Sequence, residues 1–157
     1  MNFSQPSADL ARIVASGCGL GFVPRAPGTL AAAVATLIAA GLIAVSPFLV
    51  VVAATLAIAV GFWAIPKAGG SGDPGWVVID EFAGQWIALF VVPRPDAPIL
   101  IAGFVLFRLL DISKPGPIRA AERLPGALGV IADDVVAGAI AALILLAARL
   151  LWYGALG

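Results

Sequence analysis

Residues 29–65 read TLAAAVATLIAAGLIAVSPFLVVVAATLAIAVGFWAI and contain no charged side chain. A helix needs about 20 predominantly apolar residues to cross a bilayer, and this stretch is long enough for two such helices. Ser46-Pro47 lies near its middle, where a small polar residue followed by proline favours a turn. The stretch therefore predicts a tight hairpin of two membrane-spanning helices, residues 29–45 and 48–65.

The composition of the whole chain also indicates a lipid environment. Of its 157 residues, 62% are hydrophobic and only 11% are charged. A soluble domain of this size does not need so much apolar side chain to fill its core. We therefore expect an integral membrane protein that folds as one membrane-embedded domain over residues 1–157.

Outside the hairpin, three more segments are apolar enough to cross a bilayer. These expected spans are residues 76–92, 97–110 and 131–153. Residues 8–23 are mildly amphipathic and end in a glycine-rich turn, which predicts a short interfacial helix. Asp9 and Arg12 interrupt this segment, so we expect no cleaved signal peptide there. The expected fold is all-α, with about five transmembrane helices plus a short N-terminal interfacial helix.

Basic residues fall mostly on one side of this five-span arrangement. Seven lie in or beside its N-terminal, 66–75 and 111–130 segments: Arg12, Arg25, Lys67, Arg108, Lys114, Arg119 and Arg123. Only Arg94 and Arg149 fall on the other side. Because lysine and arginine are enriched in cytoplasmic loops, we expect the first side, including the N-terminus, to be cytoplasmic.

Charge and residue types exclude several function classes. The net charge is zero, so no overall field attracts nucleic acid. The chain has no histidine, and Cys18 is its only cysteine. An intramolecular disulfide, a thiolate zinc site and an imidazole base or nucleophile are therefore excluded. Carboxylates remain as the groups for strong chemistry.

Acidic residues gather on the side predicted to be cytoplasmic. They are Asp73, Asp80, Glu81, Asp111, Asp133 and Asp134, whereas Asp96 falls on the other side. A carboxylate at membrane depth costs about 2.5–3.5 kcal/mol on insertion scales, so such groups usually face a polar cavity. Neighbouring residues on a helix point about 100° apart. In each adjacent pair we therefore expect one ligand and one supporting or capping group.

These acids favour a metal site. Oxygen ligands without histidine or cysteine select a hard cation, and several carboxylates beside a phosphorylated substrate suit Mg²⁺. Such an ion would neutralise phosphate charge and activate water. Simpler interpretations stay open at this point: Asp133-Asp134 as a helix cap, and Asp111 as an ion-pair partner of Arg108.

Basic groups near the acids are candidates to bind phosphate. Arg108, Lys114 and Arg119 could hold phosphate oxygens, or could anchor the protein to anionic lipids. Gly28-Thr29 would offer free backbone N–H groups at a helix start, or form an ordinary turn. Lys67 and Asp73 lie in a glycine-rich loop that could border the site.

Two mechanisms and two other function classes follow from these groups. Attack by metal-activated water with a carboxylate as base agrees with the residues present, and a carboxylate nucleophile stays open. The main alternative function is a small cation or proton-coupled transporter, because intramembrane carboxylates also mark ion paths. A non-catalytic scaffold for lipid synthesis is the second alternative.

Four ordered blocks of the sequence resemble the phosphatidylglycerophosphatase A family. They are GLGFVPRAPGT at 19–29, DPGWVVIDEFAG at 73–84, FRLLDISKPGPI at 107–118 and GVIADDVVAG at 129–138. The blocks occur in the order of the family and cover most of the chain. The chain departs from the family pattern after Thr29, where Ala31-Ala32 replace a Gly-Ser pair.

The resemblance implies a magnesium-dependent enzyme of the bacterial inner membrane, and the charge distribution adds an active site on the cytoplasmic face. The reaction implied is hydrolysis of the phospholipid phosphatidylglycerophosphate to phosphatidylglycerol and phosphate. Candidate metal ligands are Asp80, Glu81, Asp111, Asp133 and Asp134. Candidate catalytic residues among them are Asp80, Glu81 and Asp134. Candidate phosphate-binding residues are Arg108, Lys114, Thr29 and Arg119.

Overall fold

The computed structural model describes residues 6–154, and within this range the chain is entirely helical. The elements are α1 (Pro6–Ala15), the 3₁₀ turn η1 (Leu20–Phe22), α2 (Pro27–Val45), α3 (Phe48–Lys67), α4 (Ile79–Leu89), α5 (Ala97–Ser113), α6 (Gly116–Glu122) and α7 (Ala127–Gly154). The all-α prediction is confirmed for these residues. The described range leaves out residues 1–5 and 155–157. The predicted domain over residues 1–157 and the predicted cytoplasmic N-terminus therefore lie partly outside it.

The predicted helical hairpin is confirmed. Helices α2 and α3 meet at Ser46-Pro47, and the N–H of Ser46 donates to the carbonyl of Leu42 at 2.8 Å to close α2. Within residues 6–154, three helices are long and apolar enough to cross a membrane: α2, α3 and the part of α7 from Ala127 to Leu151. Many of their apolar side chains are exposed, such as Leu37 with 74% and Leu151 with 75% of its surface free. Such a surface suits lipid.

The prediction of about five spans is not confirmed. Helix α4 has 11 residues, about 16 Å at 1.5 Å per residue, roughly half the hydrocarbon thickness of a bilayer. It begins only at Ile79, because the N–H of Val78 donates to the carbonyl of Ala15 at 2.9 Å. At its other end the N–H of Phe90 turns back to the carbonyl of Ile87. Helix α5, with 17 residues, measures about 25 Å.

The N-terminal helix α1 is attached to the rest of the protein. Ala15 packs in a buried cluster with Ala64 of α3. The guanidinium of Arg12 lies 5.4 Å from the ring centroid of Phe22 and 5.2 Å from that of Trp76. A helix is therefore present where the sequence predicts one, and its location at the membrane interface stays a prediction.

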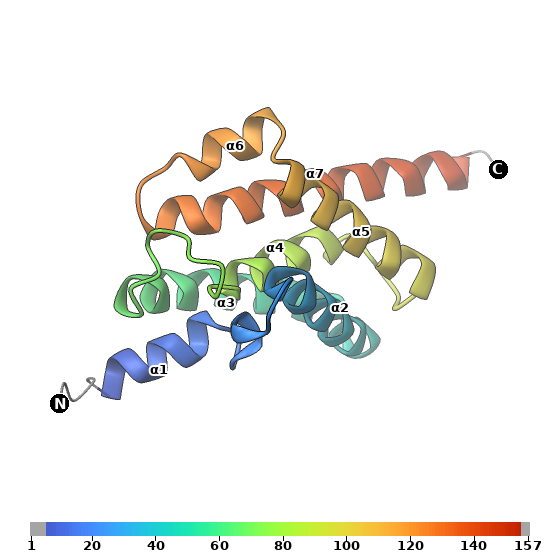
Figure 1. The fold of residues 1–157 in the computed structure, drawn as a ribbon. Helices are drawn as coiled ribbons and strands as arrows, with labels where there is room; N and C mark the ends of the chain where they lie inside the picture. The colour runs from blue at the N-terminus through green and yellow to red at the C-terminus, as the bar shows by residue number, and fades with distance from the viewer. Residues whose placement is uncertain (1–5, 155–157) are drawn as a thin grey trace.

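Helix α4 lies at the centre of the bundle and packs against α2, α3, α5 and α7 (Figure 1). Glycines allow the backbones of α4 and α7 to touch: a Cβ on Gly138 would lie 2.2 Å from the carbonyl oxygen of Gly84. A Cβ on Gly84 would lie 2.7 Å from the carbonyl oxygen of Asp134. On the other side of α4, the indole N–H of Trp86 donates to the carbonyl of Ala35 at 2.9 Å. These contacts fix where the first turn of α4 lies.

The close contact between α4 and α7 predicts that a methyl group added at Gly138 destabilises the protein. Gly138→Ala should lower the free energy of unfolding by about 1–3 kcal/mol, because overpacking forces the two backbones apart. Gly41→Ala, on α2 where a new Cβ meets no atom within 4 Å, is the matched control and should be neutral or slightly stabilising. Thermal unfolding in detergent, followed by circular dichroism, measures both. Equal melting temperatures for the two variants would contradict the close approach.

Candidate functional site

The five predicted carboxylate ligands come from three helices and meet at one end of the bundle. Asp80 and Glu81 lie in the first turn of α4, Asp111 lies near the end of α5, and Asp133 and Asp134 lie in α7. Asp80, Asp133 and Asp134 are buried, with exposed fractions of 5%, 4% and 3%. Because α7 begins six residues before Asp133, the interpretation of Asp133-Asp134 as a helix cap is wrong.

The carboxylates form two groups of three that share one residue. One oxygen from each of Asp80, Glu81 and Asp134 lies within 4.8 Å of the other two, and the same holds for Asp111, Asp133 and Asp134. Asp134 therefore connects the acids of α4 to the acid of α5. Asp80 and Glu81 both belong to the first group, and Asp133 and Asp134 both belong to the second. The expected division of each adjacent pair into one ligand and one supporting residue is therefore not seen in the geometry. Groups of carboxylates at this spacing could hold a hard cation.

Arg108 balances part of this negative charge. Its Nη1 lies 2.5 Å from Oδ2 of Asp111 and 4.0 Å from Oε1 of Glu81. The predicted ion pair between Arg108 and Asp111 is therefore confirmed, one turn apart on α5. The guanidinium also borders Glu81. Arg108 therefore remains next to both groups of carboxylates although it is paired with Asp111.

Lys114 balances a second part of the charge and joins three helices. It ends α5 in a left-handed conformation with φ of 44°, and its Nζ donates to Asp133 at 2.7 Å and to Glu122 at 2.6 Å. Burial lowers the pKa of Lys114, but its hydrogen bonds with Asp133 and Glu122 outweigh this and raise the pKa above the ordinary value. Lys114 is therefore a firmly charged group, and five clustered carboxylates face two cations.

Several buried polar atoms beside the acids have no hydrogen-bond partner among the described residues. They include Oδ1 of Asp80, Oε2 of Glu81 and Nε of Arg108. An unpartnered buried polar group costs about 1–3 kcal/mol, and more when it is charged. A cation would satisfy the two carboxylate oxygens, and a phosphate oxygen would satisfy the guanidinium. Because every candidate ligand atom is a carboxylate oxygen, the donor set fits Mg²⁺ better than a softer metal.

The start of α2 lies directly against the acids. A Cβ on Gly28 would lie 2.1 Å from Oε1 of Glu81 and 3.3 Å from Nη2 of Arg108, so any larger residue would displace that carboxylate. Thr29 follows, half-buried, and its hydroxyl makes no hydrogen bond within residues 7–151. Arg119 is exposed on α6 and forms no ion pair in the same range. The structure brings the backbone of α2 to the acids, and the roles of these two side chains stay predictions.

A polar cavity of about 220 Å³ adjoins the acids. Asp73, Glu122 and Asp133 line it, so the loop of Asp73 borders the site as the sequence suggests. Burial raises the pKa of Asp73. Lys67, expected in the same loop, is instead the last residue of α3 and lies over the ring of Trp63, 5.2 Å from its centroid.

One polar residue in the site is not among the residues predicted from sequence. Gln85 is fully buried on α4, and neither atom of its amide has a partner among the described residues. Residues 81, 85 and 88 share one face of a helix. Glu81 meets Gly28 of α2, and Ala88 packs with Ala32 of α2, so Gln85 lies between them, one turn below the acids. Its only signal in the sequence is a lone amide within an apolar segment.

Comparison with known proteins gives consistent matches. The profile of the family described as Phosphatidylglycerophosphatase A matches residues 13–149. A phosphatidylglycerophosphatase A of Escherichia coli (strain K12) is 38% identical over 147 residues, which cover 85% of this chain and 80% of the relative. The protein of the same name from Haemophilus influenzae is 36% identical over 142 residues, 86% of each chain.

A third relative carries a different name. A provisionally named phosphatidylinositol-3-phosphatase of Bacteroides thetaiotaomicron is 39% identical over 146 residues, which cover 87% of this chain and 92% of the relative. No solved structure matches the chain. The resemblance seen in the four sequence blocks is confirmed, because the family profile spans all of them. This chain belongs to the phosphatidylglycerophosphatase A family.

Proposed function

We propose that this protein hydrolyses phosphatidylglycerophosphate to phosphatidylglycerol and inorganic phosphate at the clustered carboxylates. Family membership supports the activity, and the observation that carries the site is the pair of carboxylate groups sharing Asp134. The acids gather at one end of the bundle rather than in a file through it, which favours hydrolysis over transport of protons or cations. A non-catalytic scaffold would have no use for so many buried charges.

The residues proposed to hold Mg²⁺ are the five clustered acids, Asp80, Glu81, Asp111, Asp133 and Asp134. Bound Mg²⁺ would offset the charge on phosphate oxygens and activate water. The excess of carboxylates over cations and the unpartnered oxygens of Asp80 and Glu81 support this assignment. A site with three or more oxygen ligands and a phosphorylated substrate is the usual setting for this ion.

Side chains around the acids are assigned to the phosphate. Arg108 borders Glu81, and its Nε has no hydrogen-bond partner within residues 6–154, so its fork can orient two phosphate oxygens. Lys114 holds Asp133 in place, and its charge attracts the phosphate. Thr29 and Arg119 are proposed as outer phosphate contacts.

The proposed reaction needs one proton acceptor near the phosphorus. One of Asp80, Glu81 and Asp134 would take the proton of the attacking water as the bond between phosphorus and the glycerol oxygen breaks. The glycerol oxygen then takes up a proton, so the products are an alcohol and inorganic phosphate. Attack by a carboxylate followed by hydrolysis would give the same products.

We further propose that residues 1–157 form one multi-pass domain of the bacterial inner membrane. Helices α4 and α5, with their flanking turns, would act as short spans beside α2, α3 and α7. Basic residues near the acids, among them Lys114 and Arg119, support a cytoplasmic location for this end of the bundle. The acyl chains would stay in the bilayer while the head group reaches the acids, which supplies proximity without a deep pocket.

Phosphate release by the purified protein in detergent should require Mg²⁺ and stop when a chelator is added. Asp80→Asn and Asp134→Asn keep the side-chain volume but remove a charge, so each should lower the rate by about a hundredfold or more. Asp9→Asn, exposed on α1, is the matched control and should leave the rate unchanged. Calorimetric Mg²⁺ titration checks binding independently of activity. Full activity in both site variants would contradict the proposal.

The same assay separates the two substrates suggested by the relatives. Phosphatidylglycerophosphate and phosphatidylinositol 3-phosphate with identical acyl chains are supplied at equal amounts in mixed micelles. We expect faster release from the former, because two of the three relatives above carry its name. A higher kcat/KM for the inositol lipid would instead assign the activity named for the third relative.

Replacement of Gln85 should separate activity from stability. Gln85→Leu removes a buried amide that has no partner among the described residues, so the free energy of unfolding should stay equal or rise. Phosphate release should fall by about tenfold, because the unused donor and acceptor of this amide, one turn below Glu81, are no longer offered to bound substrate or water. Thr55→Val, which removes an exposed hydroxyl on α3, is the control. Unchanged phosphate release by Gln85→Leu would show that the amide has no part in the reaction.

The hydrogen bonds of Lys114 should stabilise the protein equally at pH 7.5 and at pH 9. Lys114→Gln should lower the free energy of unfolding by about 1–3 kcal/mol, because Asp133 loses a charged hydrogen-bond partner. The pKa of Lys114 is raised on folding, so its contribution is complete below the unfolded pKa of about 10.4 and is lost as pH rises through the folded pKa. Chemical unfolding at pH 7.5 and pH 9 should give the same loss. Lys67→Gln, exposed on α3, is the control, and a loss that vanishes by pH 9 would refute the assignment.

A further inference from the structure

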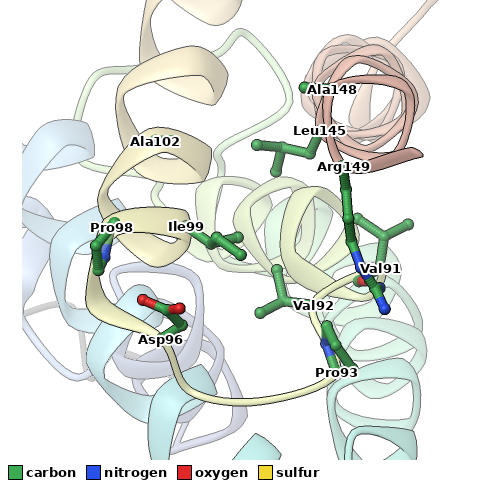
Figure 2. Close-up of a pocket in the computed structure, with 10 residues that line it drawn as sticks. All are labelled: Val91, Val92, Pro93, Asp96, Pro98, Ile99, Ala102, Leu145, Ala148 and Arg149. Atoms are coloured by element: carbon green, nitrogen blue, oxygen red, sulfur yellow. The ribbon is translucent and has the colours of Figure 1, made fainter. Parts of the chain in front are cut away.

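A second cavity, of about 470 Å³, lies at the end of the bundle opposite the carboxylates. The turn between α4 and α5, the start of α5 and the last part of α7 enclose it (Figure 2). Its walls are mostly apolar, with Val92 and Ile99 among them, and two charged residues, Asp96 and Arg149, complete the lining. Nothing in the proposed phosphatase reaction uses this cavity.

The position of the cavity along the bundle separates it from the acids. Arg149 follows Asp134 by 15 residues on the same helix, about 22 Å at 1.5 Å per residue. The hydrocarbon core of a bilayer is about 30 Å thick. In the proposed membrane orientation, a site this far from the acids lies near the other boundary of the membrane, where phospholipid head groups of the second leaflet are the nearest polar molecules.

The two charged residues lie on opposite sides of the cavity, with Val92 and Ile99 between them (Figure 2). Nη1 of Arg149 donates to the carbonyl of Val91 at 3.2 Å, which holds the guanidinium at the wall. Asp96 is the N-cap residue of α5, but its side chain makes no capping hydrogen bond. Because an N-cap aspartate usually accepts from the first turn of its helix, this carboxylate is available to another donor.

We propose that this cavity binds the head group of a bilayer phospholipid that carries both a phosphate and a primary ammonium. Arg149 binds the phosphate oxygens, and Asp96 accepts hydrogen bonds from the ammonium. The apolar walls contact the glycerol and the first acyl carbons. The volume lies within the roughly 300–1,000 Å³ of small-molecule sites, and an apolar lining with a few placed charges is their usual chemistry.

The pair of opposite charges selects among head groups. A phosphatidylglycerol head group would bring a phosphate to Arg149 but offers no cation to Asp96. A choline head group carries a cation but no N–H to donate to the carboxylate. The ethanolamine head group offers a partner of opposite charge and an N–H donor to Asp96 and a phosphate to Arg149, so it is the preferred occupant.

Lipid binding to the purified full-length protein tests this proposal. Phosphatidylethanolamine, phosphatidylglycerol and phosphatidylcholine with identical acyl chains are each titrated in detergent, and bound lipid is counted by native mass spectrometry. We expect the dissociation constant of the ethanolamine lipid to be lower than those of the other two by about threefold or more. Asp96→Asn should remove this preference, and Ala148→Leu, which fills part of the cavity, should weaken binding of all three lipids.

Controls keep the result independent of folding and of the acid site. Arg94→Gln changes a charge in the same turn but outside the cavity lining, and should keep the preference of the unmodified protein. Thermal unfolding shows which variants are folded, and Asp96, being exposed, is replaced without loss of packing. Equal binding of the three lipids to the unmodified protein, or an unchanged preference in folded Asp96→Asn, overturns the proposal.

Discussion

The backbone contact between α4 and α7 is the constraint on which the acid site depends. Gly84 lies one turn after Asp80, and Gly138 lies one turn after Asp134. The two glycines allow their helices to touch. One carboxylate oxygen of Asp80 therefore lies within 4.8 Å of one of Asp134. Two carboxylates at this distance repel each other, so the packing of small residues below them must supply the force that keeps them together.

Charge at this end of the bundle is arranged so that repulsion is reduced but not removed. Arg108 pairs closely with Asp111 and more distantly with Glu81 of α4, and Lys114 pairs with Asp133. The acids of α4 are left with unpartnered oxygens. A protein selected for stability alone would have fewer buried acids here, so the cost of the cluster is the physical signature of a functional site.

Local features of the sequence predicted more of the structure than contacts between distant residues. The hairpin at Ser46-Pro47 follows from two apolar runs and a turn, and it is confirmed. The short α4 could not be predicted, because its start depends on a hydrogen bond from Val78 to Ala15, 63 residues earlier in the chain. The five acids were found from charge at membrane depth. Gln85 was missed because a single amide in an apolar run has no periodic signal.

In the proposed membrane orientation, the position of the acids at one end of an apolar bundle has a kinetic consequence. An enzyme whose site opens at the bilayer surface meets its lipid in two dimensions, so the relevant concentration is the mole fraction of substrate among the membrane lipids. Added inert lipid would slow catalysis at constant bulk concentration. Extraction of the acyl chains, at about 0.8 kcal/mol for each CH₂ group exposed to water, is never needed, and turnover is then coupled to the composition of the membrane rather than to that of the cytoplasm.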